Sequence, residues 1–128
     1  MVSRTTDGIK ISVIARYVPE NSNPGRNEYV YTYQVTIHNL SEKRVQLMSR
    51  HWIITDGYGR KKDVKGDGVI GKQPVLQTNG SHIYQSWCPL PTKIGKMEGT
   101  YSMVNLDTDE TFIVHIPQFL LVHEALEN

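Results

Sequence analysis

Apolar and polar residues alternate along most of this chain, a pattern typical of β-strands with one buried face. In residues 8–18 and 28–39 every second residue is apolar, including Ile9, Ile11 and Val35. Further strands are predicted at residues 44–55, 60–65, 81–88, 96–106 and 110–117, with turn-forming residues between them. No stretch of about 11 residues has a convincing helical period. The pattern therefore predicts an all-β protein of about seven strands.

Seven strands with turn signals about every 8–12 residues are typical of an antiparallel β-sandwich. Because Cys88 is the only cysteine, the Cys–Trp–Cys framework of antibody domains is missing. Within the immunoglobulin-like class, a fibronectin type III-like sandwich is therefore the better expectation. An OB-like barrel is the alternative, although no segment predicts its helix.

Two of the predicted strands have a distinctive composition. The strand at residues 44–55 has apolar residues on both faces: Val45, Leu47 and Ile53 on one, and Met48, Trp52 and Ile54 on the other. We therefore expect this strand inside a sheet, with Trp52 buried. The strand at residues 60–65 is highly charged, which suits a sheet edge guarded against pairing with another molecule. Pro89 and Pro91 are expected to force an irregular connection after residue 88.

Length and charge narrow the class of protein. At 128 residues the chain is expected to form one domain, residues 1–128. Fourteen Lys and Arg against 13 Asp and Glu give a net charge of +1, so no nucleic-acid or membrane partner is expected. The polar N-terminus does not resemble a signal peptide, and no apolar run approaches the ~20 residues of a membrane span. A cytoplasmic location is therefore predicted.

A glycine-rich loop at residues 66–71 spells GxGxxG, the spacing of dinucleotide-binding turns. The Rossmann version needs a helix directly after the loop, which Pro74 would interrupt. Three interpretations stay open. Gly66, Gly68 and Gly71 can supply positive φ angles for a bulge or turn. Their N–H groups, with Lys65 and Lys72, can form an anion site for a phosphate or nucleotide. The loop can also be read by a protein partner through its shape.

Other candidate chemistry has a structural interpretation that we favour. The five histidines lack metal-ligand spacing, so no metal site is predicted, and Asp107 with Asp109 suits a solvated turn. Cys88 is expected to be a small buried residue, because no nucleophile signature surrounds it. The tyrosine stripe at residues 29–33 is interpreted as core packing rather than a base-stacking platform. The apolar tail, residues 119–126, is expected to complete the protein's own sheet in a monomer or to form a homodimer interface.

Several motifs together resemble the ApaG family over nearly the whole chain. Arg50-His51-Trp52-Ile53-Ile54-Thr55-Asp56 is similar to its Arg-x-Trp-x-Ile-x-Asp strand. Val64-Lys65-Gly66-Asp67-Gly68-Val69-Ile70-Gly71, followed by Pro74-Val75-Leu76, resembles its glycine signature. Tyr84-Gln85-Ser86 and Ile116-Pro117-Gln118-Phe119 continue the resemblance. Two departures are Asn79-Gly80, where the family often has Pro-Gly, and Trp87, where a small residue is common.

This resemblance implies a fibronectin type III-like sandwich and a single ApaG-type domain. Bacterial members are linked by name to cobalt resistance and magnesium efflux, and related domains occur in eukaryotic F-box proteins and in a polymerase-interacting protein. The resemblance implies no catalytic residues and no cofactor. We therefore expect a non-catalytic module that binds another protein. The alternative is phosphate or dinucleoside polyphosphate binding at Lys65, Gly66, Gly68, Gly71 and Lys72.

Overall fold

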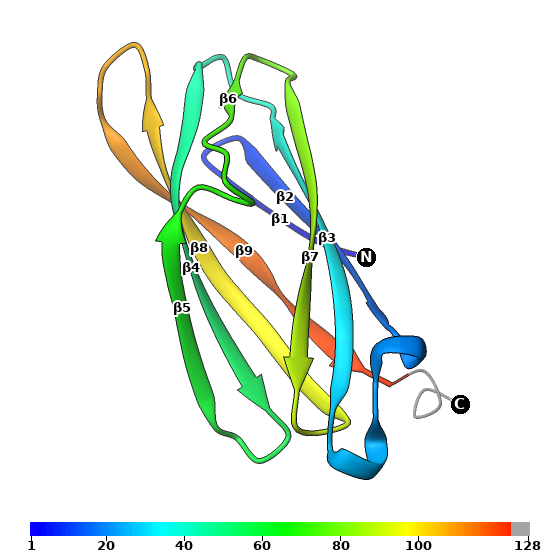
Figure 1. Ribbon diagram of the computed structural model, residues 1–128. Coiled ribbons are helices and arrows are strands. Elements are labelled where there is room, and N and C mark those ends of the chain that lie inside the picture. The colour runs from blue at the N-terminus through cyan, green and yellow to red at the C-terminus, as the bar shows by residue number, and fades with distance from the viewer. Residues whose placement is uncertain (124–128) are drawn as a thin grey trace.

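The computed structural model describes residues 1–123 as two antiparallel sheets packed face to face (Figure 1). The first sheet has the order β1–β2–β3–β7, formed by β1 (Val2–Thr6), β2 (Ile9–Tyr17), β3 (Tyr29–Asn39) and β7 (Ser81–Leu90). The second has the order β5–β4–β8–β9, formed by β5 (Lys61–Asp67), β4 (Val45–Asp56), β8 (Ile94–Asn105) and β9 (Thr111–Val122). The short strand β6 (Val75–Leu76) also pairs with β4. The predicted antiparallel β-sandwich is confirmed, and its finer likeness to fibronectin type III domains stays a prediction.

The period-two pattern correctly placed the core. On β2 and β3 the alternating apolar residues face the opposite sheet, and most of them are almost fully buried: Ile9, Ile11, Val13, Tyr17, Tyr29, Tyr31, Tyr33, Val35 and Ile37. The tyrosine stripe is therefore core, as expected. The Tyr84 and Tyr101 hydroxyls hydrogen-bond to each other and join β7 to β8 across the sandwich. The loop between β2 and β3 contains two exposed 3₁₀ turns, η1 (Pro19–Asn21) and η2 (Pro24–Arg26).

Two strands were not predicted from the sequence pattern. β1 carries mostly exposed, polar residues, because it is a sheet edge and buries little side-chain surface. β6 has only two residues, too few for a periodic pattern. The charged strand predicted at residues 60–65 is β5, and it lies at a sheet edge as expected.

The predicted faces of β4 were wrong after residue 47. A register shift between Leu47 and Ser49 inserts Met48 as a bulge, which reverses the parity of every later residue. Val45 and Leu47 therefore share the buried face with Trp52, rather than opposing it. The prediction that β4 lies inside its sheet is confirmed, because β5 and β8 flank it.

Proline did not end the strands where the sequence predicted. β7 continues through Pro89 to Leu90, with Pro89 opposite Val30. This is tolerated because β7 is an edge strand, where a missing N–H disrupts no second ladder. β9 likewise runs past Pro117, which sits in a register shift opposite Met97–Gly99. Phe119 and Leu121 are buried in the last part of β9, whereas residues 124–126 of the predicted tail lie outside the described residues. The choice between monomer and homodimer stays a prediction.

The two sides of the sandwich differ. On one side the edge strands β1 and β9 lie next to each other, and the His115 N–H donates to Thr6 Oγ1 at 3.2 Å. On the other side the edge strands β5 and β7 lie apart (Figure 1), and residues of both line a groove. Within the described residues, the structure contains no helix with the length and apolar character needed to cross a membrane.

Trp52 is expected to be a major contributor to folding stability. Its side chain is 2% exposed and meets Tyr33 and Phe119 edge-on, with ring centroids 5.4 and 5.9 Å apart. Trp52→Ala should lower the free energy of unfolding by about 3–5 kcal/mol, as is typical for a buried aromatic truncation. Urea unfolding measures this loss. The control is Trp87→Ala, which removes the side chain of an exposed tryptophan. A loss below about 1 kcal/mol for Trp52→Ala would contradict its role in the core.

Candidate functional site

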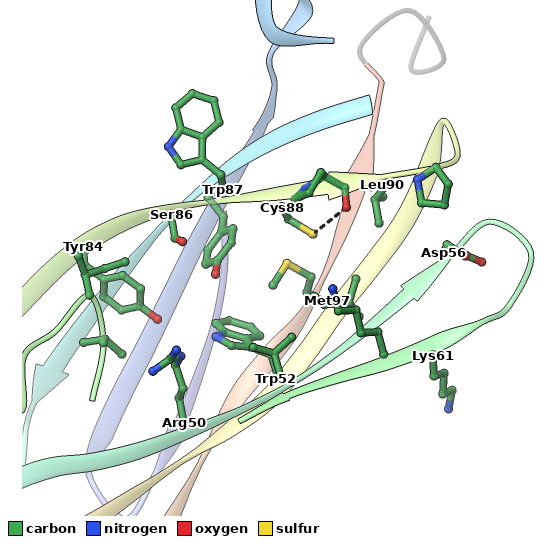
Figure 2. Close-up of a pocket in the computed structure, with 18 of the residues that line it drawn as sticks. Arg50, Trp52, Asp56, Lys61, Tyr84, Ser86, Trp87, Cys88, Leu90 and Met97 are labelled. Carbon is green, nitrogen blue, oxygen red and sulfur yellow. Dashed lines mark hydrogen bonds between the residues drawn. The ribbon is translucent and has the colours of Figure 1, made fainter. Parts of the chain in front are cut away.

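The groove between β5 and β7 has a volume of about 650 Å³ and is open to solvent. In Figure 2, Arg50, Trp52, Tyr84 and Met97 point into the groove from β4, β7 and β8, whereas Trp87 and Lys61 point away from it. Its aromatic lining residues are Tyr33, Trp52, Tyr84 and Trp87, and its basic ones are Arg50, Arg60, Lys61 and Lys62. We call this feature the β5–β7 groove. The glycine loop lies at one end of it through Asp67, Val69, Ile70 and Gly71.

The side chains on the floor of the groove have low chemical reactivity. Burial raises the pKa of the Cys88 thiol to about 11, and its hydrogen bond runs to the Pro89 carbonyl oxygen. The thiol is therefore protonated at neutral pH and a poor nucleophile, and the sequence interpretation of Cys88 as a buried residue is confirmed. Burial also raises the pKa values of Tyr33 and Tyr84. Among the described residues that line the groove there is no histidine to act as a base.

Two apolar side chains at the rim of the groove are exposed to solvent. Trp87 points away from the floor (Figure 2), and its side chain is 54% exposed. Ile70 is 60% exposed and has a φ of +47°. A β-branched residue rarely adopts a positive φ, so Ile70 is held in a strained conformation at an exposed position. Because most of its side chain is exposed, Ile70 contributes little to the core.

Arg50 connects the groove to the glycine loop. Its Nη1 donates to the carbonyl oxygens of Asp67, at 3.0 Å, and Gly68, at 2.9 Å. The Gly68 N–H in turn donates to the Met48 carbonyl oxygen at 2.9 Å, next to the bulge of β4. The loop is therefore fastened to β4 in the gap between β5 and β6, which both pair with the same strand.

The tip of the glycine loop is a two-residue hairpin turn. Val69 and Lys72 exchange both backbone hydrogen bonds, at 2.8 and 3.0 Å. The two residues between them, Ile70 and Gly71, both have positive φ, as a type I′ turn requires. The buried Val69 side chain anchors this hairpin in the core.

Each glycine of the motif has its own structural reason. Gly68 has a φ of +62°, and a Cβ there would overlap the Lys72 carbonyl oxygen. Gly71 has a φ of +72° with open space around it. Gly66 does not have a positive φ; a Cβ there would lie 2.8 Å from Arg50 Nη1. The positive-φ interpretation therefore holds for Gly68 and Gly71, while Gly66 leaves room for the guanidinium.

The structure separates the residues of the predicted loop site. Lys65, on β5 opposite His51, borders a shallow depression on the outer face of its sheet instead of the β5–β7 groove. Lys72 is exposed. Burial lowers the pKa of the His82 imidazole, and the positive charge of Lys72 lowers it further. Of the five predicted residues, only Gly71 lines the groove. The N–H groups of Gly68, Val69 and Lys72 already donate within the protein. Anion or partner binding at this set stays a prediction.

Sequence reasoning missed the residues that the groove brings together. Arg50 and Tyr84 lie on strands far apart in the chain, and a single arginine in a strand looks like any exposed residue. The one available signal was the resemblance, since Arg50 opens the Arg-x-Trp segment and Tyr84 the Tyr-x-Ser segment. Within residues 1–123 no three His, Cys, Asp or Glu side chains are grouped to hold a metal ion.

The chain is similar in sequence and in structure to proteins that carry the names ApaG or ApaA. Residues 19–105 match the family model described as the ApaG domain. The chain is 48% identical to Protein ApaG of Methylobacterium sp. (strain 4-46), covering 94% of this chain and 92% of that protein. It is 47% identical to Protein ApaG of Acidithiobacillus ferrooxidans, covering 88% of each. A Bordetella pertussis crystal structure under the name ApaA is 46% identical, with a TM-score of 0.88 over 91% of this chain and 94% of that one.

Substituting two glycines of the same loop tests the role of Gly68. Gly68→Ala should lower the free energy of unfolding by about 3 kcal/mol, because strained φ and a backbone overlap combine. In Gly71→Ala only the φ is strained and no atom overlaps, so the free energy of unfolding should fall by only about 1 kcal/mol. Thermal and urea unfolding of both variants measure the difference. Equal losses would show that the Lys72 carbonyl moves aside and that Gly68 is needed only for its φ.

Proposed function

Because the chain belongs to the ApaG domain family, we propose that it is a non-catalytic module that binds another protein through the β5–β7 groove. The observation that carries this proposal is the rim, where Trp87 and the strained Ile70 expose apolar surface beside an aromatic floor. Tryptophan, tyrosine and arginine are the residues that dominate protein interfaces energetically. Backbone strain held at an exposed position supports a binding role for the loop tip.

The groove also gives little support to catalysis. Its thiol is held protonated, and the Asp56 carboxylate accepts a hydrogen bond from Arg60 Nε at 2.9 Å. A nucleophile would need an adjacent base to become reactive. The groove is therefore better suited to holding a ligand than to transforming one.

The alternative function, phosphate or dinucleoside polyphosphate binding at the glycine loop, has weaker support. Three of the loop's backbone N–H groups are used internally, and Lys65 and Lys72 do not converge on one point of the groove. The links to cobalt resistance and magnesium efflux, and a cytoplasmic location, stay predictions of the resemblance and the sequence.

Photo-crosslinking from single positions tests the protein-binding proposal. A benzophenone amino acid replaces Trp87 on the groove rim or, as a matched control, Leu120, which is 63% exposed on β9 of the other sheet. We expect defined crosslinked proteins from position 87 that an excess of the untagged wild-type chain suppresses, and few from position 120. The same crosslinked proteins in the same yield from both positions would contradict a binding role for the groove.

A further inference from the structure

The charge on Arg50 has no acidic partner in the part of the chain that the structure describes. The side chain is partly buried on the floor of the groove, and its hydrogen bonds go to two backbone carbonyl oxygens. Among residues 1–123, no carboxylate forms an ion pair with it. A carboxylate can accept two parallel hydrogen bonds from a guanidinium and also carries a full negative charge, which neutral carbonyl oxygens do not.

The neighbouring tyrosines do not neutralise this charge. Burial raises the pKa values of Tyr33, Tyr84 and Tyr101 more strongly than Arg50 lowers them. All three hydroxyls are therefore neutral at physiological pH. The Tyr84 and Tyr101 hydroxyls also share a hydrogen bond with each other. The tyrosines of the floor thus leave the positive charge of Arg50 intact.

The rest of the groove adds positive charge. Its lining residues include four cations and two carboxylates. One of these carboxylates, Asp56, pairs with Arg60, while Lys61 and Lys62 are exposed and form no ion pair with any described residue. The net charge of +2 on the groove contrasts with the near-neutral chain. This local excess favours an acidic occupant, since charge complementarity guides both encounter and register.

We infer that the β5–β7 groove binds an extended acidic segment of a partner protein. One Asp or Glu side chain of that segment pairs with Arg50, and a neighbouring acidic residue faces Lys62, which lies on β5 opposite Ile54, with Lys61 adding positive charge next to it. An adjacent aromatic or aliphatic side chain packs against Trp87 and Ile70 on the rim. This inference rests on the proposed function and adds the chemistry of the partner.

Selection of peptides tests the chemistry directly. A phage library of random dodecapeptides is selected against the full wild-type chain at low salt, and the enriched peptides are synthesised. We expect enrichment of Asp and Glu next to Trp, Phe, Leu or Ile, with binding that weakens as salt is added. Enriched peptides that are neutral or basic, or an absence of enriched peptides, would overturn the inference. In that case crosslinking from position 87 still decides the proposed function independently.

Charge-reversed variants locate the binding site of the enriched peptides. Lys61→Glu/Lys62→Glu should weaken binding about tenfold or more, because two exposed attractive charges become repulsive. Lys65→Glu/Lys72→Glu is the matched control: it makes the same charge change outside the groove lining and should alter affinity by less than about threefold. Arg50→Met should abolish binding, with circular dichroism confirming the fold. A larger effect of the control pair would overturn the inference and favour an anion site at the glycine loop.

Discussion

The organisation of the open side of this sandwich depends on one side chain, Arg50. Its guanidinium donates to the backbone of Asp67 and Gly68, and Gly66 leaves room for it, because a Cβ there would lie 2.8 Å from its Nη1. Hydrogen bonds from a charged donor are worth about 1.5–3 kcal/mol each, roughly twice a neutral one. They hold the loop against β4 at the bulge, where the ladder with β5 ends and that with β6 has not begun. The arginine and glycine motifs are thus two parts of one contact.

The asymmetry of the sandwich explains why there is a groove at all. β1 and β9 lie together and close one side, whereas β5 and β7 stay apart on the other. The charges on β5 are typical of an edge strand guarded against pairing with another molecule. The space between them is filled partly by aromatic side chains and by Val69 from the glycine loop, and the remainder is the groove. The separation of β5 and β7 therefore accounts both for the open side of the fold and for the position of the candidate site.

The alternation on β2 and β3 was enough to predict the sheets and their core, because one face of each strand is buried along its whole length. The same rule failed on β4, since a bulge at Met48 changes the face of every later residue and leaves no mark in the sequence. The separate expectation that Pro89 ends its strand also failed, because only the sheet order shows that β7 is an edge strand. The groove was beyond prediction for a related reason. Arg50, Trp87 and Ile70 come to border one groove only when the two sheets are packed.

The most direct test of this account is amide hydrogen exchange in the wild-type chain and in Arg50→Met. If Arg50 fastens the glycine loop, the amides of Gly68, Val69 and Lys72 should exchange about ten to a hundred times faster in the variant, as the loss of one or two charged hydrogen bonds implies. Amides in the middle of β3 should change much less, because they lie in the other sheet. Unchanged exchange at the three loop amides would contradict the central role of Arg50.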